Sequence, residues 1–256
     1  MSGLALECAA RNDIGRRANN EDAVFISPRV AAVADGVGGA AAGEVASHRI
    51  VDSLALLDKS RLDIPLDAAL ENAIAWGNES IGFIASARPQ LAGMSTTLTA
   101  VALSNEGMYV IANIGDSRTY LLRDGALTQL SRDDSLVQDL IDAGHLTPEQ
   151  ARRHPARNVV MHALGGDPER RPVTKVVPAQ DGDRLLLCSD GLSDTIDHAT
   201  LQEVLNTRKD RDDCADHLIT LALEQGARDN VSAIVADVVP RTDPSTAWQQ
   251  AVTATG

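Results

Sequence analysis

The sequence contains few cysteines and few aromatic residues. The three cysteines, Cys8, Cys188 and Cys214, are too few and too scattered among 256 residues for a disulfide framework or a zinc site. Such usage is typical of a reducing compartment. Aromatic residues make up 2% of the chain, so we expect a core built from Ala, Val, Leu and Ile.

Basic residues and long apolar runs are also scarce. The chain has 23 Lys and Arg against 36 Asp and Glu, a formal net charge of −13. This balance argues against nonspecific nucleic-acid binding and against docking on an anionic membrane. No apolar run reaches the length of about 18 residues that a membrane helix needs. The first residues, "MSGLALECAARND", also lack the basic start of a signal peptide, so we expect a cytoplasmic protein.

The signature motifs of several enzyme classes are missing. The sequence has no G-x-x-x-x-G-K-[ST], no H-E-x-x-H and no G-x-S-x-G. The glycine-rich stretch "GVGGAAAGE" fits neither a nucleotide P-loop nor the dinucleotide-binding spacing. These absences exclude the corresponding nucleotide, zincin and serine-hydrolase sites.

The sequence patterns predict short strands and a few helices. Helical periodicity is found at about 44–57 and 65–87, and again at about 211–225. Strand-like runs, among them "RVAAVAD", "TTLTAVALS", "MYVIANIG" and "NVSAIVADVV", mostly follow one another across short turns, whereas residues 133–165 suggest short helices and loops. This order lacks the βαβα alternation of a parallel sheet. It predicts an α+β protein with antiparallel sheets and helices on their outer faces.

The sequence contains four Asp-Gly pairs, at residues 35–36, 124–125, 181–182 and 190–191. The pairs at 124–125 and 181–182 are predicted to be turns, because polar or strand-like segments flank them. The other two end the apolar runs "VAAVA" and "LLLCS" without a returning strand. Each is predicted to place a carboxylate at the end of a buried strand, followed by a glycine that lets another group approach the backbone.

Further acidic residues occupy similar positions. Asp116 ends the run "VIANIG", Asp229 precedes the last strand, and Glu21 and Asp22 precede "AVF". Any one of them alone could be a helix cap or a turn residue. At strand ends near one rim they could instead meet, and clustered carboxylates raise one another's pKa unless a cation neutralises them. Oxygen ligands suit Mg²⁺ or Mn²⁺.

Six motifs follow one another along the chain: "RANNED" (17–22), "ADGVGG" (34–39), "GMSTTLTA" (93–100), "IGDSRTYLLRDG" (114–125), "LLLCSDGLSD" (185–194) and "ARDNVSAIV" (227–235). In this order and spacing they resemble a known family, the type 2C (PPM) metal-dependent serine/threonine protein phosphatases of bacteria. The resemblance extends from about Ala9 to Val238.

The resemblance implies a four-layer α-β-β-α sandwich, with two antiparallel sheets face to face and helices packed outside. Residues 1–240 would form the catalytic domain, and residues of about 133–170 within it would form the flap beside the active site. Residues 241–256 are expected to be a disordered tail.

The resemblance also implies a metal centre with two Mn²⁺ or Mg²⁺ ions. Asp35 would bridge the two ions, the Gly36 carbonyl would bind one of them, and Asp190 and Asp229 would complete the other site. Asp22 and Glu21 would act mainly through metal-bound waters.

Two more residues take roles from the resemblance. Asp116 would help to hold a weaker third ion. Arg17 would bind the phosphate, because a planar guanidinium suits bidentate contact; Arg17, Asp35 and Asp190 are therefore the candidate catalytic residues.

The implied reaction is hydrolysis of phosphoserine and phosphothreonine by a water molecule that two metal ions activate, without a phosphoenzyme. The expected partners are phosphorylated proteins and a cognate Ser/Thr kinase, and the chain is expected to be a monomer. Two alternatives stay open: a pseudophosphatase that only binds, and a two-metal hydrolase of small phosphoesters. The presence of Asp35, Asp190 and Asp229 favours the enzyme.

The sequence departs from the family pattern at four places. Arg16 stands beside Arg17 in a shortened segment, and Val37 replaces a histidine proposed as general acid in some members, so a water molecule would protonate the leaving group. In the flap, Asp134 occupies a position where histidine is common, and His162 a position where arginine is frequent. Substrate choice and flap behaviour are the properties that these departures affect.

Overall fold

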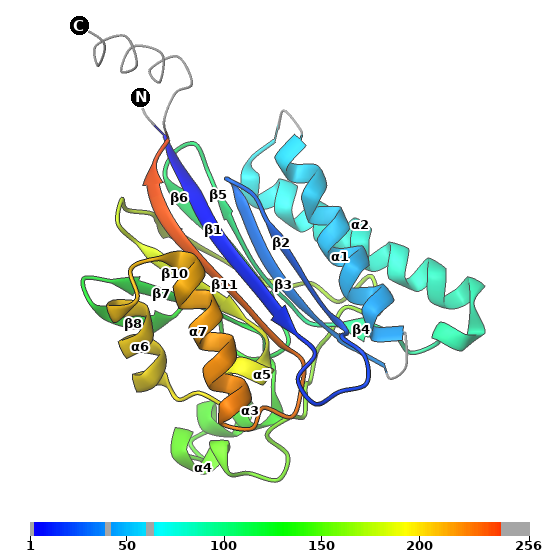
Figure 1. Ribbon diagram of the computed structural model, residues 1–256. Helices are drawn as coiled ribbons and strands as arrows, with labels where there is room; N and C mark the ends of the chain where they lie inside the picture. The colour runs from blue at the N-terminus through cyan, green and yellow to red at the C-terminus, as the bar shows by residue number, and fades with distance from the viewer. Residues whose placement is uncertain (1–2, 39–41, 60–63, 242–256) are drawn as a thin grey trace, which may run out of the picture.

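The chain folds as two antiparallel β-sheets packed face to face between two layers of helices (Figure 1). The computed structural model describes residues 3–38, 42–59 and 64–241. In this part of the chain, one sheet has the order β1-β11-β10-β7-β8 and the other β2-β3-β5-β6-β9, with β4 paired to β3. This confirms the predicted α+β sandwich. The predicted tail lies, apart from Arg241, outside the described residues.

The first sheet is formed by β1 (Leu4–Asp13), β7 (Arg118–Arg123), β8 (Ala126–Gln129), β10 (Arg184–Cys188) and β11 (Val231–Pro240). The second is formed by β2 (Asp22–Ile26), β3 (Val30–Val37), β4 (Ser95–Thr96), β5 (Leu98–Leu103), β6 (Met108–Ile114) and β9 (Val173–Pro178). The helices are α1 (Ala42–Lys59), α2 (Leu66–Ala87), η1 (Pro89–Leu91), α3 (Leu136–Asp142), α4 (Pro148–Arg152), α5 (Asp190–Ser193), α6 (His198–Thr207) and α7 (Arg211–Glu224).

The four layers explain why the central strands are apolar on both faces. Leu185 and Leu187 of β10 point into the core between the sheets, whereas Leu186 and Cys188 belong to the cluster under α6 and α7. Successive side chains of a strand point to opposite faces, so a strand between two apolar layers has no polar side. The run "LLLC" is therefore a doubly buried strand.

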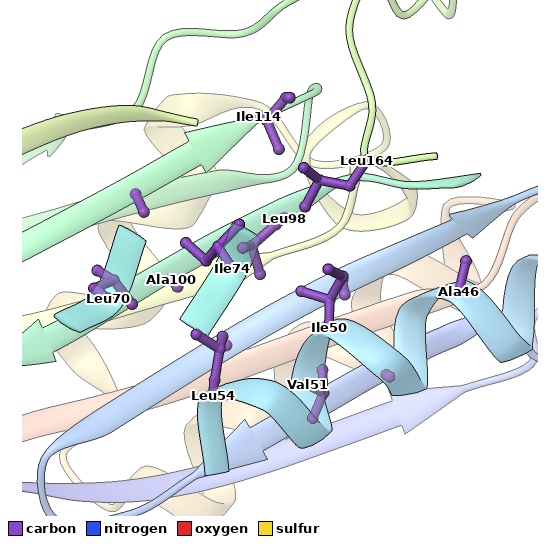
Figure 2. Packing of buried hydrophobic residues seen from close by; sticks show 14 of the residues in the cluster. Ala46, Ile50, Val51, Leu54, Leu70, Ile74, Leu98, Ala100, Ile114 and Leu164 are labelled. Carbon is purple, nitrogen blue, oxygen red and sulfur yellow. The ribbon is translucent and has the colours of Figure 1, made fainter. Parts of the chain in front are cut away.

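Helices α1 and α2 pack on the outer face of the second sheet. Figure 2 shows Ile50 and Leu54 of α1, together with Ile74 of α2, in one cluster with Leu98 and Ala100 of β5. The predicted helix at 65–87 is confirmed, with Pro65 at its N-cap. Among the helices that the structure describes, none has the length and hydropathy needed to span a bilayer.

The turns occur where the sequence predicts them, and three short helices, η1, α5 and α6, were not predicted. Asp124 and Gly125 have φ values of 52° and 79° and close the β7–β8 hairpin. Gly182, with φ 86°, lies in the turn that joins β9 of one sheet to β10 of the other. The sequence did not predict α6, a short helix whose N-cap Asp197 accepts a hydrogen bond from the Thr200 amide.

Candidate active site

A cleft of about 590 Å³ lies at one rim of the sandwich, where strands of both sheets end or begin. The predicted site residues that line it are Arg17, Glu21, Asp35, Gly36, Asp116, Asp190 and Asp229. They come from five separate stretches of the chain, as the sequence predicts for strand ends that share one rim. Asp22 does not line the cleft and lies buried behind it, 3% exposed.

Asp35 sits near the end of β3, and its backbone is held from two sides. Its amide donates to the Thr97 hydroxyl at 3.0 Å, and its carbonyl accepts from the Thr96 hydroxyl and the Thr97 amide, both at 2.9 Å. The Thr97 hydroxyl also bonds to Ser117 at 2.8 Å. Because these contacts fix the backbone, the Asp35 carboxylate has a defined position in the cleft.

Gly36 and Gly43 allow the first turn of α1 to approach β3. A Cβ atom on either glycine would overlap the other's backbone. The Gly36 amide donates to the Glu21 carbonyl at 3.1 Å, and that carbonyl also accepts from the Ser47 hydroxyl at 2.6 Å. This close approach is the backbone role predicted for the glycine that follows Asp35.

Asp190 is the first residue of α5, separated from β10 by Ser189 alone, and Gly191 packs on the backbone of the loop before β11. A Cβ atom on Gly191 would overlap the Asn230 carbonyl oxygen. The Asn230 side chain in turn donates to the carbonyls of Ile14 and Asn19, both at 2.9 Å, and accepts from the Glu21 amide at 2.9 Å. The loops that carry Glu21, Asp190 and Asp229 are thereby tied together.

Arg17 and Asp229 form an ion pair at the mouth of the cleft. The distance between Arg17 Nη2 and Asp229 Oδ2 is 2.6 Å, and the Arg17 side chain is 58% exposed. This pair holds the guanidinium beside the carboxylates. Arg16 points elsewhere, since its Nη2 atom lies 3.6 Å from where a Cβ of Gly226 would stand.

Asp22 connects the two sheets beneath the cleft. It pairs with Asp35 in the β2–β3 register, and its Oδ2 accepts hydrogen bonds from Ser189 at 2.9 Å and from Ser232 at 2.6 Å. Ser189 follows β10 and Ser232 lies on β11. Among the described residues, Asp22 Oδ1 and Asp190 Oδ1 are buried and have no hydrogen-bond partner.

Burial and mutual repulsion raise the pKa values of these carboxyl groups. Burial raises the pKa of Asp22 to about 6, although hydrogen bonds from Ser232 and Ser189 oppose the rise. Burial, and then the charge of Asp133, raise the pKa of Asp116 to about 6. The pKa of Asp35 and that of Asp190 lie well above the usual range, because of burial and then the neighbouring aspartates.

The donor set fits divalent cations. Buried carboxylate oxygens without partners, on groups that repel one another, are stabilised by a cation that neutralises them. In the described part of the chain, no three His, Cys, Asp or Glu side chains already form a closed metal-binding group. Mg²⁺ usually takes only one or two protein carboxylates and keeps several waters, so an open arrangement suits it.

Sequence reasoning missed the residues that support the site. Thr97, Ser117, Ser189, Asn230 and Ser232 position the carboxylates through the hydrogen bonds above. Ser117, Ser189 and Asn230 lie directly beside a predicted ligand, so adjacency was the available clue for these three. Asp194, also missed, is near enough to contribute to the raised pKa of Asp190.

The flap residues that depart from the family pattern form a contact at its base. The Asp134 amide donates to the Gly115 carbonyl at 2.8 Å, and Asp134 Oδ2 accepts from the Gly115 amide at 3.2 Å. His162 Nδ1 lies 4.0 Å from Asp134 Oδ1. The flap is therefore attached directly to the loop that carries Asp116.

Comparison with known proteins identifies relatives over almost the whole chain. The family described as Protein phosphatase 2C matches residues 11–234. The serine/threonine protein phosphatase PstP of Mycobacterium tuberculosis is 48% identical over 237 residues, which cover 92% of this chain and 46% of PstP. This chain thus spans about half the length of that relative. The serine/threonine phosphatase stp of Listeria innocua is 37% identical over 241 residues, covering 89% of this chain and 94% of stp.

Solved structures share the fold. A crystal structure of the catalytic domain of PstP in complex with two manganese ions has a TM-score of 0.86 and 46% identity, covering 92% of this chain and 99% of that one. PppA of Pseudomonas aeruginosa has a TM-score of 0.81 and 33% identity, covering 93% and 100%. From its sequence, its fold and the residues of its cleft, this chain belongs to the protein phosphatase 2C family.

Proposed function

We propose that this chain is a metal-dependent phosphatase that removes phosphate from phosphoserine and phosphothreonine in proteins. The observation that carries the proposal is the convergence of Asp35, Asp116, Asp190 and Asp229 on one cleft, in a chain of this family. The cleft combines these acidic groups with Arg17, so it offers ligands for cations and a contact for a phosphate.

The proposed cofactors are two Mn²⁺ or Mg²⁺ ions, with a weaker third ion near Asp116. Asp35, the Gly36 carbonyl, Asp190 and Asp229 would hold the two ions, and Glu21 and Asp22 would support them from the edge and from below. When bound, the ions supply a water molecule whose pKa is low enough for attack near neutral pH.

The residues of the chain bind and orient the substrate. Arg17 is held at the cleft by Asp229 and presents further N–H groups for phosphate oxygens, a geometry that suits bidentate contact. Val37 lines the cleft, and its side chain has no ionisable proton to donate. The leaving serine or threonine oxygen therefore takes its proton from water. The fixed backbone of Asp35 keeps its carboxylate in place through the reaction.

Further proposals concern the cellular setting. The relatives are named as serine/threonine phosphatases, which supports phosphorylated proteins as substrates and a cognate Ser/Thr kinase as the opposing enzyme. The acidic composition and the free cysteines support a cytoplasmic location. We propose a monomer.

Two substrates and two conditions test the function. We expect hydrolysis of p-nitrophenyl phosphate and of a phosphothreonine peptide with Mn²⁺, and none with EDTA. Turnover that persists in EDTA would contradict the two-metal mechanism. No turnover of either substrate with Mn²⁺ would favour a pseudophosphatase, and turnover of the small ester alone would favour a small-phosphoester hydrolase.

A further inference from the structure

A second cleft, of about 680 Å³, adjoins the candidate active site. The two clefts share Arg17, Asn158, Asp190 and Asp229. From there the second cleft extends to Arg157 of the flap and to Arg228 of the loop between α7 and β11. Figure 1 shows that the lower end of α7, α5 and the flap helix α3 lie at the same end of the molecule.

Arginines gather around this second cleft although the chain is acidic overall. Arg228 lines it, and Arg16 reaches Gly226, another lining residue. Both arginines are exposed, and neither forms an ion pair with another described residue. The Arg157 guanidinium is only loosely paired, 3.8 Å from Asp194.

The inner end of the second cleft, shared with the active site, carries Asp190 and Asp229, whose proposed role is metal binding. Away from that end Asp194 also lines the cleft, and it faces Arg157. Arg228 at the outer end, and Arg16 beside the lining residue Gly226, have guanidinium groups free to meet an anion in solution. Arginine binds carboxylates and phosphates through paired N–H groups, so the free arginines select for an anionic group.

We propose that this second cleft binds an anionic side chain of the substrate peptide close to the phosphorylated residue, an inference that rests on the proposed function. An extended peptide advances about 3.3 Å per residue, so a cleft of this size accommodates about two to three residues beside the phosphoresidue. The anionic group is a carboxylate or a second phosphate. The preferred substrates are thus acidic or multiply phosphorylated segments.

Matched phosphothreonine peptides test this preference on the full chain with Mn²⁺. One peptide has glutamine at two and three residues on both sides of the phosphothreonine; the others have glutamate, a second phosphothreonine or lysine at these positions. We expect kcat/KM to be about fivefold higher for glutamate than for glutamine, more for phosphothreonine, and lower for lysine. The advantage should shrink at high salt, because the arginines are exposed.

The variants R16Q/R228Q and R228E link the preference to the cleft, and R49E is the control, since Arg49 is exposed on α1 away from both clefts. The glutamate-to-glutamine ratio should fall toward one in R16Q/R228Q, fall below one in R228E, and stay unchanged in R49E. A ratio near one in the wild-type chain, or an unchanged ratio in R16Q/R228Q, would overturn the proposal.

A binding measurement separates this inference from the proposed function. Fluorescence anisotropy of the same labelled peptides reports affinity without turnover. If no peptide is hydrolysed, the proposed function fails, yet binding still tests the cleft: tighter binding of the glutamate peptide that R16Q/R228Q abolishes supports it, and equal binding of all peptides contradicts it.

Discussion

The floor of the cleft, formed by the proposed metal ligands Asp35, Asp116, Asp190 and Asp229, and the flap beside it differ in how they are held. Under the floor, Asp22, Ser189 and Ser232 form a buried network that joins the two sheets. In the flap, α3, whose residues are all described, buries none of its side chains, and α4 buries Ala151. The backbone pair of Thr96 with Leu164 and the hydrogen bond from the Asp134 amide to the Gly115 carbonyl attach the flap to the rest. The carboxylates proposed for chemistry thus lie at or near strand ends that are held by buried contacts, whereas the segment proposed to meet the substrate is held by few buried side chains.

The largest effect is expected at the floor, from Asp190→Asn. The change removes one negative charge and keeps the shape of the side chain. We expect the turnover of p-nitrophenyl phosphate to fall by about 10²–10³-fold or more, as for loss of a preorganised charged group in an active site. The metal-free variant should be at least as stable as the wild type in thermal unfolding, because a source of repulsion is gone. Wild-type turnover would exclude Asp190 as a ligand.

The second-largest effect is expected in the thermal stability of the chain, which should depend jointly on Mn²⁺ and on pH. Without metal, Asp22 and Asp116 have pKa values of about 6, above the unfolded value of about 3.9. Between these values the folded chain binds more protons than the unfolded chain, so these groups lower stability as pH rises from about 4 to about 6. Mn²⁺ replaces the protons and removes this loss. We expect the increase in Tm on adding Mn²⁺, compared with EDTA, to be several degrees larger at pH 7 than at pH 5.

An equal increase in Tm on adding Mn²⁺ at pH 5 and at pH 7 would contradict the proposed link between metal binding and the protonation of these carboxyl groups. The same comparison on Asp22→Asn separates the contributions, because the variant keeps Asp116 and loses the titration at position 22. Its pH dependence in EDTA should be weaker than that of the wild type.

A smaller effect is expected from Ser232→Ala. The change removes the 2.6 Å hydrogen bond to Asp22 and leaves a buried carboxylate less well satisfied. We expect a loss of about 1–3 kcal/mol in unfolding free energy and a 10–100-fold weaker apparent affinity for Mn²⁺ in activity titrations. The control is Ser53→Ala, at a buried serine whose hydroxyl, among the described residues, donates within α1 to the Ile50 carbonyl. Equal metal affinity in both variants would show that Ser232 has no role beyond packing.

The sequence predicted the carboxylates of the floor better than the serines that position them and better than the contacts of the flap. Asp35-Gly36 and Asp190-Gly191 were separable from the turn pairs, because an apolar run before them and no strand after them is a local pattern. The roles of Ser189 and Ser232 could not be read in the same way. Their partner Asp22 is far away in the chain. The hydrogen bonds that Ser189 and Ser232 donate to it can be recognised only once the pairing and packing of the two sheets are known. For the flap, the departures at Asp134 and His162 were visible, but their contact depends on how two loops meet.

The smallest effect is expected at the base of the flap, from Asp134→Ala. The change removes the acceptor for the Gly115 amide and the negative charge near His162; the Asp134 side chain is 13% exposed and that of His162 is 47% exposed. We expect a loss of about 1 kcal/mol in unfolding free energy. The kcat for p-nitrophenyl phosphate should stay within about threefold of wild type, because the change leaves the proposed metal ligands in place. The KM for a phosphothreonine peptide should rise if the flap contacts the peptide, as proposed. The control is Asp139→Ala. Asp139 is an exposed residue of α3 that forms an ion pair with Arg132. If Asp134→Ala lowered kcat for both substrates as strongly as Asp190→Asn, the base of the flap would have to count as part of the floor, and the contrast between the two regions would fail.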